Sequence, residues 1–100
     1  MMQGTTPTHH FTLPFDTKVV ANARIIYAQN EKVVFKKELS DCQCNANTIS
    51  VTLTQEETLK FSFPKTVQIQ VRILTTGGDA LNSEIYTVGV EECLDKEVLA

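Results

Sequence analysis

The feature that most constrains the fold of this chain is the alternation of aliphatic and polar side chains between residues 66 and 75. A helix would distribute side chains at this spacing around its axis, whereas a strand places every second one on the same face. The segment is therefore predicted to be a strand with one buried face. Its inward positions are Val67, Ile69, Val71 and Ile73, and its outward positions are Gln68, Gln70 and Arg72.

Residues 48–54 repeat this alternation, with aliphatic side chains inward and β-branched threonines outward. Apolar runs bounded by turn residues predict further strands at residues 8–13, 23–29, 32–38 and 41–44, and a last strand within 81–90. Turns are expected at residues 30–31, 45–47 and 76–79, where Asn and Gly tolerate positive φ. Gly89, inside the last strand, indicates a bulge or a close backbone approach.

One short helix is expected to interrupt the β pattern near residues 54–60. Thr54 and Glu57 have the spacing of a capping box, in which each side chain bonds the other residue's backbone N–H. The strand that follows limits this helix to about two turns. Such a crossover would carry the chain from one sheet to the facing one, with Leu59 and Phe61 closing the end of the core.

These elements predict an all-β fold, a single antiparallel β-sandwich of six to seven strands over residues 1–100. Residues 1–7 are expected to form an N-terminal arm, and residues 91–100 a short tail or helical turn. In that last segment, Val90, Leu94 and Val98 have the spacing of one helical face. Because so short a helix is marginal alone, the segment would dock on its own sandwich, pair with another subunit, or fray.

Composition excludes several classes of function. Nine basic against twelve acidic residues give a net charge of −3, without the positive surface of a nucleic-acid-binding protein. No stretch approaches the roughly 20 apolar residues of a membrane helix. The first residues show neither the basic region nor the apolar run of a secretory signal. We therefore expect no nucleic-acid partner, no membrane partner and no secretion by a signal peptide.

The cysteines and histidines are the first candidates for chemistry. Cys42 and Cys44 would leave one face of a strand with α-carbons about 6.5–7 Å apart, at or beyond the usual limit for a disulfide. Their spacing is also too short for a zinc half-site, and Cys93 offers a single partner at best. His9 and His10 would point to opposite faces of a strand, so they cannot chelate one metal ion there. No metal site or cofactor is predicted.

No catalytic residue is predicted either. Nucleophilic catalysis needs a nucleophile, a base and an orienting group together, and the serines lack the G-x-S-x-G turn or a similar placement. The side chains of Glu56 and Glu57 diverge, and the pair is better explained as a helix start. Gly77-Gly78 belongs to a hairpin, because no helix follows it to hold a phosphate. We expect that the chain is not an enzyme and has no small-molecule substrate.

Contact surfaces remain. The outward face of the 66–75 strand is polar and carries little charge, which fits a protein contact as well as an ordinary solvated sheet. The strand beginning at Thr8 is expected at an edge, where a partner can add a strand. Tyr27 and Tyr86 are expected in the core, because each shares strand parity with aliphatic neighbours. The predicted interaction residues are Gln68, Gln70, Arg72, Thr8, His10 and Thr12.

Four stretches carry a resemblance to a known family. Residues 3–15 (QGTTPTHHFTLPF), 25–30 (IIYAQN), 53–61 (LTQEETLKF) and 67–75 (VQIQVRILT) are similar to the N-terminal domain of the phage baseplate upper protein family. The resemblance implies an immunoglobulin-like sandwich used as a building block of a virion or its tail, with no catalytic residues. Gln3 stands where the family pattern usually has a basic residue.

The resemblance implies a non-enzymatic phage or prophage structural protein, an accessory of the tail or baseplate. Its partners would be other phage structural proteins or further copies of itself, and its location the host bacterial cytoplasm during assembly and then the virion. Two other classes remain open from the residues. One is a small adhesive or carbohydrate-binding module, and the other is an intracellular inhibitor or regulator that binds a host protein.

Overall fold

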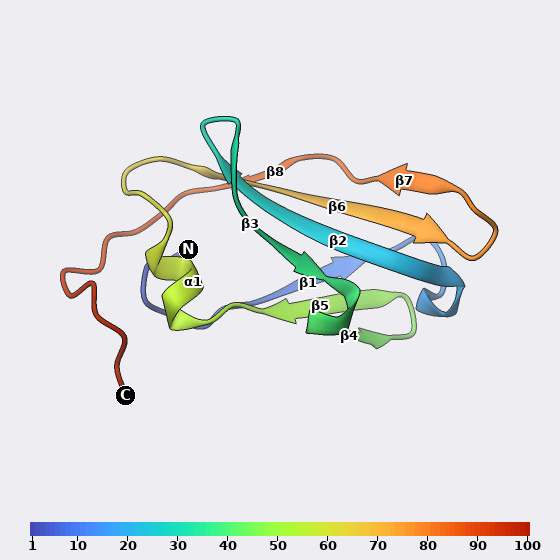
Figure 1. Ribbon diagram of the computed structural model, residues 1–100, viewed down its shortest axis with the longest axis horizontal. Helices are drawn as coiled ribbons and strands as arrows, with labels where there is room; N and C mark the ends of the chain where they lie inside the picture. The colour runs from blue at the N-terminus through green and yellow to red at the C-terminus, as the bar shows by residue number, and fades with distance from the viewer.

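The computed structural model describes residues 1–100 and consists of two antiparallel sheets packed face to face (Figure 1). The smaller sheet holds, in order, β1 (Thr8–Thr12), β5 (Thr48–Thr52) and β4 (Cys42–Asn45). The larger sheet holds, in order, β3 (Lys32–Glu38), β2 (Val20–Gln29) and β6 (Val67–Thr75), and then β7 (Ala80–Asn82) and β8 (Tyr86–Val88), which both pair with β6. The predicted all-β sandwich is confirmed.

The core lies between β2 and β6 on one side and β1 and β5 on the other. Every second residue of β6 is buried, as the alternation in the sequence predicts. Tyr27, on β2, is fully buried as predicted, and its ring stacks on Phe35 with centroids 4.8 Å apart. The third ring of this aromatic cluster, Phe61, lies 5.3 Å from Phe35 and 6.1 Å from Tyr27. Large rings thus fill one end of the interior.

The short helix is α1 (Gln55–Leu59), and it connects β5 of the smaller sheet to β6 of the larger one. Its capping box is present, since Glu57 N–H donates to Thr54 Oγ1 at 3.1 Å and Thr54 N–H donates to Glu57 Oε1 at 2.9 Å. Phe61 closes the end of the core as predicted, whereas Leu59 is half-buried. With five residues, α1 is the longest helix, so no helix could cross a membrane.

The hairpin turns also follow the sequence. Asn30 and Glu31, between β2 and β3, have φ of 50° and 64°, as a two-residue hairpin requires. Ala46 (φ 52°) turns the chain between β4 and β5, and Gly78 (φ 90°) turns it between β6 and β7. Two single-turn 3₁₀ helices, Thr17–Val19 and Leu39–Asp41, complete the connections.

The last predicted strand is the main difference from the expected fold. Residues 81–90 form two strands instead of one, which raises the strand count to eight. Two residues of β6 lie between Ile69 and Arg72, while three lie between their partners Tyr86 and Asn82, so one extra residue is accommodated between β7 and β8. There Ser83 Oγ accepts a hydrogen bond from the backbone N–H of Val71 at 2.9 Å.

The prediction of a bulge or a close backbone approach at Gly89 is wrong. It lies beyond β8, and a Cβ added there would meet no atom within 4 Å, so no close backbone approach requires glycine. Its carbonyl instead accepts a hydrogen bond from the amino group of Met1 at 2.6 Å. This contact is part of a parallel pairing in which Gln3 N–H donates to the Glu91 carbonyl at 3.0 Å.

The helical alternative for residues 91–100 is wrong, because the segment has no helix. Val90 is buried, but Leu94 is 92 % exposed and Val98 is 51 % exposed. The tail is held by polar contacts: Cys93 N–H donates to Gln3 Oε1 at 3.1 Å, and Leu99 N–H donates to Gln55 Oε1 at 2.9 Å. An apolar stripe forms a stable helix only where a surface covers it, and here Leu94 is left almost fully exposed.

Candidate functional site

The free edge of β1 is the most distinctive surface of the fold. At the two ends of its pairing with β5, Leu53 N–H donates to the Pro7 carbonyl at 2.9 Å and Leu13 N–H donates to the Asn47 carbonyl at 2.7 Å. Both bonds involve odd-numbered residues on the β1 side. Because bonding direction alternates along an antiparallel strand, the even-numbered residues direct their N–H and C=O groups away from β5. These residues are the predicted Thr8, His10 and Thr12.

The other edges of the two sheets are protected, whereas β1 is not. Strand β3, at the edge of the larger sheet, carries Lys32, Lys36 and Lys37 and has a register shift opposite Tyr27 and Ala28. Strand β4 has four residues, and β7 and β8 have three each. Lysines, irregular register and short length all discourage pairing with another chain. Strand β1 has five regularly paired residues and no Lys, Arg, Asp or Glu.

The side chains along this edge form a polar face without formal charge. Thr8 Oγ1 lies 2.8 Å from Thr52 Oγ1, and His10 Nδ1 lies 2.7 Å from Ser50 Oγ. Thr12 is exposed opposite Thr48. The first two pairs bond β1 to β5 through their side chains, which helps to hold the edge in a regular extended form.

The other three predicted residues lie on the opposite face of the sandwich. Gln68, Gln70 and Arg72 project outward from β6, and each bonds a neighbour on its own sheet or turn. The structure therefore brings the six residues into two separate surfaces instead of one.

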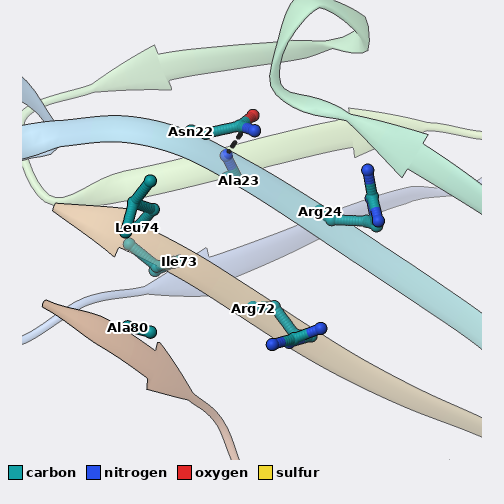
Figure 2. Close-up of a pocket in the computed structure, with 7 residues that line it drawn as sticks. All are labelled: Asn22, Ala23, Arg24, Arg72, Ile73, Leu74 and Ala80. Atoms are coloured by element: carbon teal, nitrogen blue, oxygen red, sulfur yellow. Dashed lines mark hydrogen bonds between the residues drawn. The ribbon is translucent and has the colours of Figure 1, made fainter. Parts of the chain in front are cut away.

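A shallow cavity of about 250 Å³ lies on that second face, between Arg24 and Arg72 (Figure 2). The two arginines are register partners on β2 and β6. Arg24 Nε donates to Glu38 at 3.0 Å, and Arg72 Nε donates to Asn82 at 3.1 Å. Their guanidinium groups extend toward different neighbouring strands and do not converge on one point (Figure 2). This geometry does not form an anion site.

Beside the free edge of β1 lies an apolar groove of about 350 Å³. Leu81 pairs with Ile73 and Tyr86 pairs with Ile69, so both side chains are on the inward side of the larger sheet. They are nevertheless 43 % and 46 % exposed. The smaller sheet ends at β1, and no strand lies opposite β7 and β8 to cover them (Figure 1). The principal lining residues are Phe11, Leu13, Phe15, Leu81, Glu84 and Tyr86.

Tyr86 therefore corrects one prediction from the sequence. Its strand parity predicted the correct face of the sheet, but the prediction that the side chain is buried was wrong. Parity contains no information about the width of the opposing sheet. Its ring lies 6.2 Å from that of Phe11, which is half-buried at the rim of the smaller sheet. An aromatic pair thus stands at the open side of the sandwich.

The titratable groups of the interior have structural partners. His9 and His10 do point to opposite faces, and His9 Nδ1 lies 2.7 Å from the buried Tyr27 hydroxyl. Burial, with smaller contributions from the N-terminal charge and His10, lowers the pKa of His9. Burial raises the pKa of the Cys42 thiol to about 11, which keeps it protonated and unreactive at neutral pH. Cys42 and Cys44 share one side of β4, as predicted, and all three thiols are free.

Buried polar contacts at the closed end of the sandwich were not foreseen. Gln3 is buried, and its side-chain amide donates to the Phe61 carbonyl at 2.6 Å. Lys37 Nζ, on β3, lies 2.7 Å from a Glu57 carboxylate oxygen on α1. Neither contact has a local sequence signal, because each joins segments far apart in the chain.

Comparison with known proteins gives a structural neighbour but no family. No family model and no curated protein matches the chain. Among solved structures, the V domain of amphioxus IgVJ-C2 matches with 14 % identity and a TM-score of 0.36, over 89 % of this chain and 95 % of that one. A similarity of that size carries no argument about function.

Proposed function

We propose that this chain is a non-catalytic structural protein that acts through protein–protein contacts, as an accessory of a phage tail or baseplate. The observation that carries the contact role is the unprotected edge of β1 beside an apolar groove. The resemblance of residues 3–15, 25–30, 53–61 and 67–75 to the N-terminal domain of the baseplate upper protein family supports the virion setting.

Strand addition is the mode of contact that this edge supports. Thr8, His10 and Thr12 together offer three N–H donors and three C=O acceptors to an incoming strand. Main-chain bonds of this kind contribute affinity, and a neighbouring pocket that takes alternate side chains contributes specificity. The groove beside β1 is such a pocket, since its walls are mainly apolar and aromatic.

The proposal is tested by inducing the prophage and analysing purified particles by mass spectrometry. The chain is expected to sediment with the particles in a fixed ratio. His10→Pro should abolish that association, because the His10 N–H faces the free edge and its loss removes no bond to β5. His10→Ala, which keeps the N–H, is the matched control. Absence of the wild-type chain from particles, with stoichiometric recovery of a host enzyme instead, would support the regulator class in place of this proposal.

One observation favours a second candidate, a carbohydrate-binding module. Tyr86 is 46 % exposed next to Phe11, and Asn82 and Glu84 lie in the same groove. Sugar rings stack on exposed aromatic faces, and amide and carboxylate groups bond their hydroxyls. Glycan-array binding that Tyr86→Ala abolishes would support this function. Tyr27 has no part in such a site, because it is fully buried.

A further inference from the structure

We propose that the groove beside β1 is the place of a missing strand, and that residues 94–98 of a second copy of the chain fill it. The inference rests on the proposed contact role of the β1 edge and names its occupant. Copies joined in this way associate head to tail, since the donor segment and the acceptor groove are different surfaces.

The two sheets of the sandwich differ in width. Strands β7 and β8 extend past β1 (Figure 1). Their inward side chains Leu81 and Tyr86 are therefore partly exposed. A strand placed beside β1 would take up its free N–H and C=O groups. The same strand would lie under β7 and β8 and cover both exposed side chains. One extended segment thus satisfies the unpaired backbone and the exposed apolar surface together.

The same overhang excludes a symmetric pairing of two folded β1 edges. In such a pair, each β1 would occupy the space beneath the β7 and β8 of the other copy. Each β1 is already covered on that side by its own larger sheet, as the contacts of His9 with Tyr27 and of Phe11 with Tyr86 show. Two larger sheets cannot occupy one layer. The occupant must therefore be a segment without a second layer of its own.

Residues 94–98 have the properties of such a segment. Leu94 is 92 % exposed, and Val98 is 51 % exposed beside Leu53 in a shallow pocket, so much of their apolar surface is uncovered within the chain. In an extended conformation, Leu94, Lys96 and Val98 share one face. Two apolar side chains would then enter the groove, and the Lys96 ammonium between them would face the Glu84 carboxylate at the rim.

The segment is anchored in a direction that favours a second copy over its own groove. Cys93 is bonded to Gln3, and Leu99 to Gln55 at the start of α1. The tail therefore runs past the end of the molecule at which α1 lies, whereas β7 lies at the other end (Figure 1). The bond of Lys96 Nζ to Gln3 Oε1 and the partial cover of Val98 beside Leu53 also hold it there. These contacts are exchanged for main-chain bonds and apolar burial when the segment pairs with another copy.

Sedimentation velocity of the full chain over a range of concentrations tests the proposal. The wild-type chain is expected to form species larger than a dimer as concentration rises. Leu94→Asp should raise the dissociation constant about tenfold or more, because a charge replaces a side chain that becomes buried. Leu99→Asp is the matched control: it is 75 % exposed, on the opposite face of the extended segment, and should leave association unchanged.

A mixing experiment separates head-to-tail pairing from symmetric pairing. Leu81→Asp damages the groove but leaves the tail intact, and Leu94→Asp does the reverse. At concentrations where the wild-type chain first associates, each variant alone should be mainly monomeric, and their mixture should form a 1:1 dimer that grows no further. Lys96→Glu should weaken association, and Lys96→Glu combined with Glu84→Lys should restore it.

Three results would overturn the inference: a wild-type chain that is monomeric at every concentration, equal effects of Leu94→Asp and Leu99→Asp, or no dimer in the mixture. A monomeric chain that still sediments with phage particles would overturn this inference alone and leave the proposed function standing. Circular dichroism of each variant confirms that the sandwich is retained.

Discussion

His9 on β1 and Tyr27 on β2 join the two sheets through a bond of 2.7 Å between Nδ1 and the phenolic oxygen. The pair links the aromatic cluster, to which Tyr27 belongs, to the smaller sheet, with ring centroids 5.7 Å apart. Because burial lowers the pKa of His9, the folded protein holds this ring in its neutral form more strongly than the unfolded chain does.

This relationship predicts acid sensitivity. The folded-state pKa of His9 lies below its unfolded value of 6.5, so the unfolded chain binds the additional proton first. The free energy of unfolding is therefore expected to decrease as pH falls below 6.5, and the contribution of His9 is fully present above that pH. Urea denaturation between pH 8 and pH 5 measures the slope. His9→Gln, which keeps a hydrogen-bonding side chain, should reduce the slope; an unchanged slope would contradict the assignment.

The ion pair between Lys37 and Glu57 gives a second prediction. Burial opposes the ionisation of Glu57, but hydrogen bonds from Lys37 and Thr54 outweigh it and lower the pKa of the carboxyl. The two side chains are only 13 % and 18 % exposed, so Lys37→Met leaves a mostly buried carboxylate unpaired and should cost about 1–3 kcal/mol. Arg24→Met, at the exposed pair with Glu38, should cost less than about 1 kcal/mol. Equal losses in chemical denaturation would refute the distinction.

The aromatic cluster predicts a large effect at Phe61. Its ring is almost fully buried against Phe35 and Tyr27, and Phe61→Ala would leave a cavity that rigid neighbours cannot close. The expected loss in the free energy of unfolding is about 3–5 kcal/mol. Leu74→Ala, on the exposed side of β6, should change stability by roughly 0.5 kcal/mol or less. Thermal or denaturant unfolding of the two variants provides the comparison.

The turn at Ala46 predicts a stabilising substitution. A φ of 52° places the Cβ of this alanine close to backbone atoms, and glycine avoids that contact. Ala46→Gly should stabilise the fold by a few tenths of a kcal/mol to about 1 kcal/mol, after the greater flexibility of glycine in the unfolded chain is subtracted. Ala28→Gly, within β2, should instead destabilise it. A rise in the denaturation midpoint for Ala46→Gly alone is the expected result.

Prediction from the sequence succeeded where local geometry decides the outcome. Alternation predicted the inward side of β6, the capping box predicted the start of α1, and turn residues predicted the hairpins. The inward residues of β6 are Val67, Ile69, Val71 and Ile73. Prediction failed at Leu94 and Val98, which have helical spacing but lie in a segment without a helix, with Leu94 almost fully exposed. It also failed at Ser83, where an extra residue divides one strand into two.

The sequence by itself determined the two-layer β architecture, because side-chain period and turn chemistry act within a few residues of each other. It also determined which residues of β1 point outward. Only the tertiary structure decided that the smaller sheet stops at β1 and leaves Leu81 and Tyr86 uncovered. The width of one sheet relative to the other depends on pairing between distant strands, and no local pattern of side chains encodes it.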